Sequence, residues 1–209
     1  MQRPAFIARQ ASRPTGLLGR ALGALMAIET RALNDQVLDR LGIARGERIL
    51  EIGFGHGRTL ERAARNHPDA QFAGIDHADD MVAALGRRCA ALIDVGRLEL
   101  STGDSAALPW PDASFDGAFA VHTLYFWRNA EKDLSEIARI LRPDGRIVLG
   151  FRERTREAEA AFPSEIYRFR SKDEVSALLR GAGLVASVFA GPRPDLWVAE
   201  GRRARAPSA

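Results

Sequence analysis

The chain has 209 residues, and 46% of them are hydrophobic, which is enough for one well-buried domain and too many for a disordered chain. No run approaches the roughly 18 apolar residues of a membrane-spanning helix, and the single cysteine, Cys89, excludes an internal disulfide. The lone cysteine fits a reducing compartment, so we expect a cytoplasmic protein. The formal net charge of +3 is close to balance, and we expect the excess arginines to lie at the two solvated ends.

An N-terminal helix precedes the first predicted strand. A single apolar stripe recurs along it at spacings of three, four and eight residues, through Leu18, Leu22, Leu25, Leu33, Val37 and Leu41. Arginines flank the stripe, so residues 1–45 are expected to pack on the domain as a lid over a ligand, with peripheral contact to an anionic membrane as the alternative. The main domain is expected over residues 46–202, and residues 203–209 are expected to form a flexible basic tail.

Short apolar runs then alternate with helical patterns. Strands are predicted at residues 48–52, 71–76, 97–101, 116–121, 146–151, 185–190 and 196–199. Helices are predicted at residues 59–65, 79–92, 134–141 and 175–179, and Ser171 with Glu174 forms a capping box for the last of them. This alternation predicts an α/β doubly wound fold, in which helices cover both faces of a mostly parallel sheet.

Three glycines stand at alternate positions directly after the first strand and before a helix, in the segment Glu51-Ile-Gly53-Phe-Gly55-His-Gly57. Glycine is needed there because the turn requires backbone angles that side chains forbid and because a ligand must lie against bare backbone. A dinucleotide-binding fingerprint would place a glycine at position 58, where the chain has Arg58. The spacing therefore argues against a nicotinamide or flavin enzyme.

An acid lies at the end of each of the first three predicted strands. Glu51 sits inside the first strand, where a buried carboxylate needs a cation or hydrogen-bond donors, and a ligand ammonium group would serve. Asp76 ends the second strand and can accept from both hydroxyls of a ribose, while Asp104 follows the third and can accept from an adenine amine. Because parallel strands share their carboxyl edge, we expect the three carboxylates to converge on one crevice.

These residues resemble the class I S-adenosylmethionine-dependent methyltransferases, in particular the branch with methyltransferase type 11-like domains that includes small-molecule, quinone and lipid methyltransferases. The resemblance covers most of the chain and rests on residues 51–57, Gly74-Ile-Asp76 with Met81, Gly103-Asp104 with Leu108-Pro109, Phe115-Asp116, and Leu141-Arg-Pro-Asp-Gly145. It implies a Rossmann-like seven-stranded mixed sheet with strand order 3-2-1-4-5-7-6 and an antiparallel last strand. Asp144 stands where many relatives have glycine, and Gly145 is expected to take the demanding backbone angle of that turn.

By this resemblance the cofactor is S-adenosylmethionine, and its product is S-adenosylhomocysteine. The implied cofactor-binding residues are Glu51, Gly53, Gly55 and Gly57 for the methionine part, Asp76 and His77 for the ribose, Met81 for the adenine face, and Asp104 with Ser105 for the adenine edge. His122 follows the fourth strand and would border both cofactor and acceptor. For Met81, core packing along its own helix stripe is the alternative.

The acceptor is expected beyond the fourth and fifth strands. His122 and Tyr125 are the candidate catalytic residues, His122 as a general base, as an orienting group or, alternatively, as a wall residue with no proton role. The candidate substrate-pocket residues are Tyr125, Trp127, Arg152, Phe162 and Tyr167. The alternatives are core packing for the aromatic residues and a solvated loop with a short helix for residues 152–170. No metal site is expected, because the histidines lack ligand spacing.

The sequence therefore predicts an enzyme that methylates a small-molecule acceptor by in-line displacement from S-adenosylmethionine. Two alternatives stay open. One is a quinone or phospholipid methyltransferase held at a membrane surface by the N-terminal helix, and the other is a non-catalytic protein that binds the cofactor or partners another methyltransferase. No nucleic-acid partner is expected, because the asparagine-or-aspartate, proline, proline, aromatic motif is missing after the fourth strand.

Overall fold

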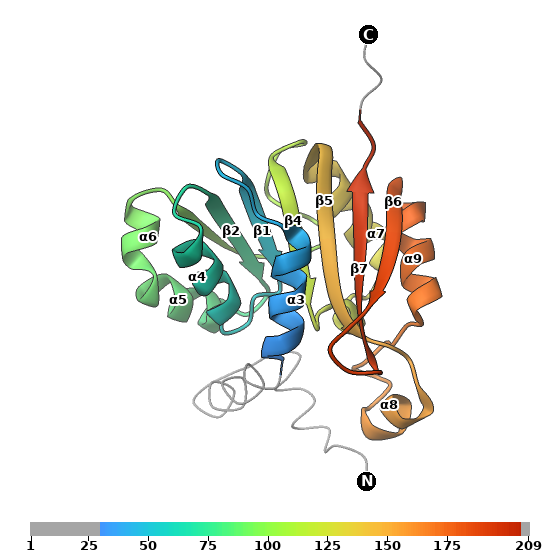
Figure 1. Cartoon of the computed structure of the whole chain (residues 1–209). Helices are drawn as coiled ribbons and strands as arrows, with labels where there is room; N and C mark the ends of the chain where they lie inside the picture. The colour runs from blue at the N-terminus through green and yellow to red at the C-terminus, as the bar shows by residue number, and fades with distance from the viewer. Residues whose placement is uncertain (1–29, 206–209) are drawn as a thin grey trace.

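A computed structural model describes residues 30–205 (Figure 1). Its strands are β1 (Arg48–Ile52), β2 (Gln71–Asp76), β3 (Leu98–Thr102), β4 (Phe115–Val121), β5 (Leu141–Arg152), β6 (Leu184–Ala190) and β7 (Leu196–Arg203). Its helices are α3 (Arg31–Leu41), α4 (Arg58–Asn66), α5 (Asp79–Arg88), α6 (Ala90–Asp94), the single turn η1 (Leu124–Phe126), α7 (Ala130–Ile140), α8 (Arg156–Ala161) and α9 (Lys172–Gly181).

The strands form one seven-stranded sheet in the order β3-β2-β1-β4-β5-β7-β6. β1 pairs in parallel with β2 and β4, and the pairs β2–β3 and β4–β5 are parallel as well. β7 runs antiparallel to both β5 and β6. These pairings confirm the α/β class, the mixed sheet and the strand order that the sequence and its resemblance imply.

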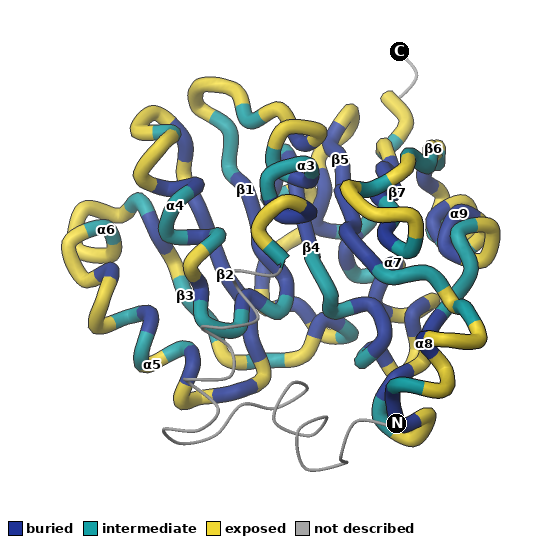
Figure 2. The backbone as a smooth tube through the Cα atoms, turned by 60° about the horizontal axis from the view of Figure 1, so that its bottom comes forward, coloured by how far each residue is buried: buried dark blue, intermediate teal, exposed yellow. Residues whose placement is uncertain are grey.

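Both faces of the sheet are buried by helices. In β1, Ile49 belongs to the apolar cluster that includes side chains of α3, α4 and α5, whereas Leu50 and Ile52 belong to the cluster that includes α7 and α9. This split follows from the strand geometry, since successive residues of a strand point to opposite faces. Figure 2 shows the strands mostly buried and the exposed backbone concentrated on turns and outer helices. A parallel sheet needs such cover on both faces.

Helix α3 carries the second half of the predicted N-terminal stripe. Its Leu33, Val37 and Leu41 are at most 1% exposed and pack in the same cluster as side chains of β4 and β5. A Cβ on Gly150 of β5 would stand 2.9 Å from Cγ2 of Val37, so the glycine lets the helix lie close to the strand. The first half of the stripe, at Leu18, Leu22 and Leu25, lies outside the described residues.

The single helix predicted at residues 79–92 is wrong, because the chain forms two helices there. α5 ends at Arg88 and α6 begins at Ala90, with Cys89 between them at φ −109° and ψ 20°. Met81, Leu85 and Cys89 are buried, whereas α6 buries none of its side chains. The chain therefore turns where the apolar stripe stops packing on the sheet.

The turn inside the long strand β5 also corrects the sequence prediction. Asp144, and not Gly145, adopts the positive φ, at +65°. Aspartate tolerates this left-handed region better than most residues. Gly145 is needed for a different reason, since a Cβ there would lie 2.7 Å from the carbonyl oxygen of Arg142. The glycine serves a close approach of two backbone segments.

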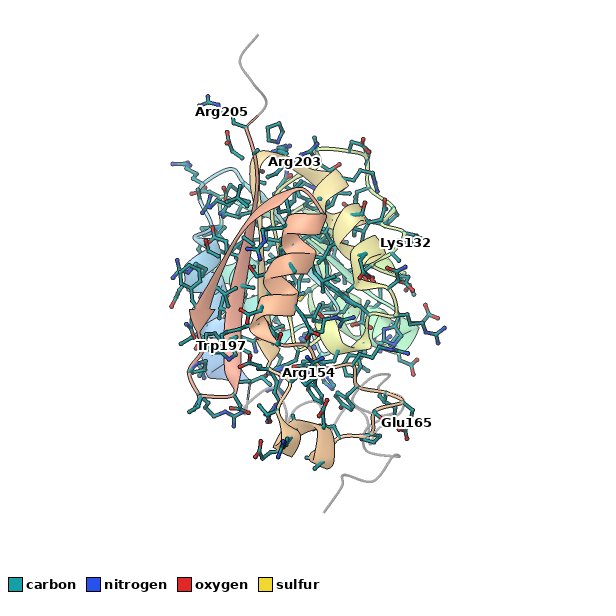
Figure 3. All side chains as sticks on the ribbon, turned by 90° about the vertical axis from the view of Figure 1, so that its right-hand side faces the viewer. Lys132, Arg154, Glu165, Trp197, Arg203 and Arg205 are labelled. Carbon is teal, nitrogen blue, oxygen red and sulfur yellow. The ribbon has the colours of Figure 1, made fainter. Side chains whose placement is uncertain are left out.

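β7 extends to Arg203, the first residue of the segment expected as a tail. The Arg203 guanidinium donates to the carbonyl oxygens of Ala138 at 3.1 Å and Arg139 at 3.2 Å, which fixes it on the end of α7. Figure 3 shows Arg203 at one end of the domain and Arg154 with Glu165 at the other. The segment that follows β5 therefore lies at the end where the parallel strands finish, beside the predicted site residues.

Candidate functional site

The three glycines between β1 and α4 all adopt the left-handed conformation. Gly53, Gly55 and Gly57 have φ values of +69°, +53° and +65°, which confirms the predicted need for glycine. A Cβ on Gly53 would collide with the side chain of Thr123, and a Cβ on Gly57 would collide with Leu85. No atom lies within 4 Å of the corresponding position on Gly55. The middle of this glycine loop, residues 53–57, therefore presents bare backbone to open space.

Asp76 ties the glycine loop to the end of β2. Its Oδ2 accepts from the amide of Gly55 at 2.7 Å, and its Oδ1 accepts from the amide of Ala78 at 2.9 Å. The side chain is 5% exposed. A carboxylate has about four lone-pair sites, so each oxygen still has one left for a ligand hydroxyl. Next to it, His77 is half exposed, with its Nδ1 3.7 Å from Oδ1 of Asp76.

Glu51 is a buried carboxyl beside the glycine loop. Burial raises its pKa well above the usual range, and the negative charge of Asp76 raises it further, against weaker opposing effects of the Leu60 backbone and of Arg62. Its Oε2 is fully buried and has no hydrogen-bond partner among residues 30–205. An unpaired buried carboxylate is costly, so this atom fits a ligand that brings a cation such as an ammonium group.

The end of β3 places one predicted residue outward and the other inward. Asp104 is exposed, and its Oδ1 accepts from the amide of Ala106 at 2.9 Å in a local turn. Ser105 is buried, and its hydroxyl donates to the carboxylate of Asp133 on α7. Asp104 is thus open to a ligand, whereas the Ser105 side chain is committed to the packing of α7 on the sheet.

Met81 lies in the core. Its side chain is 2% exposed and packs in the cluster that contains Leu60 of α4 and Leu85 of its own helix. This burial favours the alternative interpretation, in which Met81 packs along its helix stripe. Contact with a ligand would require its surroundings to move.

His122 follows β4 in an unusual conformation for a residue with a side chain. Its φ is +59°, and its amide donates to the carbonyl oxygen of Gly150 in β5 at 2.8 Å. Its Nδ1 is hydrogen-bonded to the hydroxyl of Tyr125. Desolvation, together with the guanidinium groups of Arg152 and Arg193, lowers the pKa of His122 to about 4. The imidazole is therefore neutral at neutral pH.

The aromatic residues after β4 are mostly buried. Tyr125 is 5% and Trp127 6% exposed, and both belong to the cluster beneath α7 and α9. Phe126 between them is only partly buried, with its ring centroid 5.0 Å from that of Tyr167. Burial of Trp127 favours core packing for this side chain. Tyr125 combines a buried ring with a hydroxyl that reaches His122.

The short helix expected within residues 152–170 is confirmed by α8, but the segment is not wholly solvated. Three aromatic side chains from this segment are at most 9% exposed: Phe162, Tyr167 and Phe169. The ring of Phe162 lies 4.8 Å from that of Tyr167, which stacks on Phe169 at 5.6 Å. This aromatic cluster covers Tyr125, whose ring centroid is 5.1 Å from that of Phe169. The segment forms the wall behind Tyr125.

Arg152 ends β5 beside this wall. Its guanidinium forms an ion pair with Asp195 at 2.7 Å and lies 5.6 Å from the ring centroid of Phe162. Asp195 precedes β7, which is antiparallel to β5, so the start of β7 meets the end of β5. The structure thus brings Arg152, His122 and Tyr125 together, as the sequence prediction implies.

Asp195 was missed from the sequence, and Thr123 was expected only as a member of the segment 122–127 that would border cofactor and acceptor, with no role of its own. Thr123 packs against Gly53, and its buried hydroxyl oxygen has no hydrogen-bond partner in the described part of the chain. It directly follows His122, and since β1 and β4 are neighbours, its position could have been inferred from the predicted strand order. Asp195 carries no sequence signal, because its place depends on the register of β7 against β5.

The described residues contain no group of three or more histidine, cysteine, aspartate or glutamate side chains placed to hold a metal ion. Among the helices within residues 30–205, none has the length and apolar character needed to cross a membrane.

Comparisons with known proteins agree with this geometry. Residues 50–149 match a family model described as a methyltransferase domain. An uncharacterized methyltransferase, YdaC of Bacillus subtilis, is 29% identical over 136 residues, which cover 65% of this chain and 73% of that protein. The 27-O-demethylrifamycin SV methyltransferase of Amycolatopsis mediterranei is 31% identical over 74% of this chain and 60% of its own length. An O-methyltransferase of Pyrenophora dematioidea is 33% identical, and the chain spans only 45% of it.

Solved structures share the fold at low sequence identity. A methyltransferase from Aquifex aeolicus, described as dependent on S-adenosylmethionine, has a TM-score of 0.70 at 19% identity over 97% of this chain and 99% of its own. The cyclase SpnF has the same TM-score at 21% identity, over 83% of this chain and 80% of its own, so the fold alone does not fix the reaction. The sequence match, however, runs from β1 to β5 through the glycine loop and the end of β4. The chain is therefore similar to methyltransferase domains over residues 50–149, from β1 to β5.

Proposed function

We propose that this protein transfers the methyl group of S-adenosylmethionine to a small-molecule acceptor. The observation that carries the proposal is the buried Glu51, whose unpartnered Oε2 stands beside an open glycine loop. A cationic amino-acid moiety that lies on bare backbone satisfies both features. Relatives named as O-methyltransferases support an acceptor of small size.

The residues at the carboxyl edge fit the cofactor part by part. Glu51 and the glycine loop, with Gly53, Gly55 and Gly57, would hold the methionine part. Asp76 keeps free lone pairs for the ribose hydroxyls, and His77 stands next to it. The carboxylate of Asp104 would accept a hydrogen bond from the adenine amine, and the backbone amide at Ser105 would donate one to the adenine edge. Met81 would support cofactor binding through its place in the packed core beside the site, because its side chain is not exposed.

The bound cofactor supplies an electrophilic methyl group on a sulfonium. The protein's own part is to bind and orient the acceptor in line with that methyl and to exclude water, which turns a bimolecular encounter into a positioned one. The end of β4 and the end of β5 supply His122, Tyr125 and Arg152 for this purpose. Phe162 and Tyr167 support Tyr125 from behind.

Calorimetric titration with S-adenosylhomocysteine tests the proposal directly. We expect one site per chain, and turnover when the protein is screened with labelled cofactor against thiols, phenols, amines, quinones and lipids. Binding without turnover on any acceptor would instead support the non-catalytic alternative. Failure to bind S-adenosylhomocysteine at all would refute the proposal.

The same preparation tests the membrane-surface alternative. The N-terminal helix on which that alternative rests lies outside the described residues, apart from α3. Co-sedimentation of the full chain with anionic vesicles, and turnover only on quinone or phospholipid acceptors presented in them, would favour it. An acceptor methylated equally well without vesicles would oppose it.

A further inference from the structure

The way in which β4 ends creates a short chain of hydrogen bonds. The amide of His122 donates to Gly150 of β5, and the positive φ of His122 then turns the chain away from the sheet. Arg152 lies two residues beyond Gly150, so its amide points to the same edge of β5. Burial raises the pKa of the Tyr125 phenol, and the backbone of Arg152 opposes this without outweighing it.

The roles of His122 and Tyr125 in their hydrogen bond depend on the imidazole tautomer. A phenol has one hydrogen to donate, and its oxygen can accept. Burial keeps the phenol of Tyr125 protonated, and donation of its hydrogen to the Nδ1 of His122 satisfies both groups of this contact. A neutral imidazole carries one hydrogen, so when Nδ1 accepts, Nε2 must hold it. His122 then offers its surroundings a hydrogen-bond donor at Nε2, and its one basic lone pair, on Nδ1, is occupied by Tyr125.

Both groups keep these protonation states at neutral pH. The pKa of His122 is lowered to about 4 by desolvation and by Arg152 and Arg193, with Asp195 opposing. The pKa of Tyr125 is raised by burial, and the neighbouring Tyr167 and Asp195 add to the shift. The imidazole is therefore neutral and the phenol protonated throughout the neutral range.

The charges around His122 favour an anion. Two guanidinium groups, of Arg152 and Arg193, face one carboxylate, that of Asp195, which lies 2.7 Å from the first and 3.6 Å from the second. A positive surplus next to a neutral donor disfavours a cationic acceptor and stabilises an anionic one.

We propose that Tyr125 holds His122 as an Nε2–H donor and that the site methylates acceptors that arrive as oxygen anions, namely carboxylates or acidic phenols. The proposal rests on the methyltransferase function above and specifies its acceptor class. The acceptor oxygen forms the new carbon–oxygen bond, the methyl–sulfur bond breaks, and its electron pair stays on sulfur. The products are a methyl ester or ether and S-adenosylhomocysteine, and no proton leaves the acceptor, so no base is needed. Tyr125 is a positioning residue in this scheme.

The nitrogen-15 NMR shifts of the His122 ring report the tautomer in the full-length protein without any turnover. We expect the Nε2–H form in the wild type and loss of that preference in Tyr125→Phe, with the exposed His77 as an internal control in the same spectrum. With S-adenosylhomocysteine bound, benzoate should shift the Nε2 signal of His122, and benzyl alcohol should not. An Nδ1–H form in the wild type, or no response to benzoate, would overturn the proposal.

Two substitutions separate a donor from a base. Gln keeps an N–H group but is no base, so His122→Gln should stay within about tenfold of the wild-type rate, while His122→Leu should lose about a hundredfold. Equal losses in both would contradict the donor role. Among acceptors, benzoate and 4-nitrophenol should be methylated in preference to benzyl alcohol and benzylamine. Preference for the neutral alcohol or the amine would sink this inference and leave the methyltransferase function standing, whereas loss of S-adenosylhomocysteine binding would remove both.

Discussion

Glu51 shows how a residue predicted to bind a ligand can work against folding. Its carboxyl is buried, and within residues 30–205 its Oε2 has no hydrogen-bond partner, so a bound cation would compensate it. We therefore expect Glu51→Gln to raise the free energy of unfolding of the ligand-free protein and to weaken S-adenosylhomocysteine binding by about 10- to 100-fold, as expected for a lost charge-assisted hydrogen bond. Urea denaturation and calorimetry measure the two effects separately.

Glu47 provides the matched control at the other end of β1. Burial alone would raise its pKa, but hydrogen bonds from Arg146 and from the amide of Ala44 outweigh this and lower it. Glu47→Gln should therefore destabilise the protein, because the buried guanidinium of Arg146 loses its negatively charged partner. It should leave cofactor affinity unchanged. If both substitutions shifted stability in the same direction, the electrostatic account of Glu51 would be wrong.

The pH dependence of the free energy of unfolding tests the same burial of the Glu51 carboxyl. A carboxyl whose pKa is raised by folding binds its proton more tightly in the folded state than in the unfolded one. The wild type should thus lose stability relative to Glu51→Gln as pH rises from the ordinary range of a glutamate through the raised pKa. Burial also raises the pKa of Asp133. This residue is present in both proteins, so its contribution cancels in the difference between their stabilities. A difference that stays flat or grows with pH in favour of the wild type would contradict this.

For single residues, the sequence predicted the features that depend on a short stretch of backbone. The need for glycine at Gly53, Gly55 and Gly57 and the position of Asp76 against the loop follow from a strand, a turn and a helix in succession. The partners of Tyr125 and Arg152 could not be predicted in this way, because they depend on where distant segments pack. Sequence patterns could not predict that Asp195, which precedes β7, would form an ion pair with Arg152 at the end of β5.

The start of helix α9 is determined by residues close to it in the sequence. The hydroxyl of Ser171 accepts from the amide of Glu174 at 3.2 Å, and the Glu174 carboxylate accepts from the amide of Ser171 at 2.6 Å, which confirms the predicted capping box. Ser171→Ala should lower the free energy of unfolding by about 1 kcal/mol and the Tm by about 2–4 °C. Thermal and urea denaturation test this, and S-adenosylhomocysteine affinity should not change. A fall in affinity would mean that α9 supports the site directly.

Elements with a steady apolar period were predicted well, and those that depend on tertiary packing were not. The limits of β1 and β2 match the prediction because each is a short apolar run between polar segments. α5 and α6 were predicted as one helix because Leu92 extends the apolar spacing beyond Cys89, although α6 has no buried side chain. Residues 152–170 lack a period, yet their aromatic side chains pack against Tyr125. Such contacts between distant segments leave no repeating signal.

For the whole molecule, the order of the strands decides which residues meet. Because β1 lies between β2 and β4, these two parallel strands end on either side of the glycine loop, and this brings Asp76 and Thr123 to the same edge. The antiparallel β7 then adds its start, with Asp195, to the end of β5. The predicted strand order was sufficient for the cofactor side of the site. The acceptor side required the register of the strands.

The N-terminal segment divides at the start of α3 into two parts with different expected roles. Leu33, Val37 and Leu41 are almost fully buried, and Arg146 donates to the carbonyl oxygens of Leu41 and Gly42. Burial of three such side chains contributes about 5 to 9 kcal/mol, which is comparable to the whole stability of about 5 to 15 kcal/mol of a typical domain. A chain that lacks residues 2–45 should therefore fail to fold.

Removal of residues 2–29 leaves those contacts in place, so this shorter deletion should unfold cooperatively with nearly the wild-type Tm. If residues 1–29 act as the lid that the sequence predicts, the deletion should also weaken S-adenosylhomocysteine binding, mainly through faster dissociation. Stopped-flow dissociation rates and thermal denaturation separate the two effects. An intact Tm with an unchanged dissociation rate would show that the lid hypothesis is wrong, and loss of folding in the shorter deletion would show that α3 alone does not complete the core.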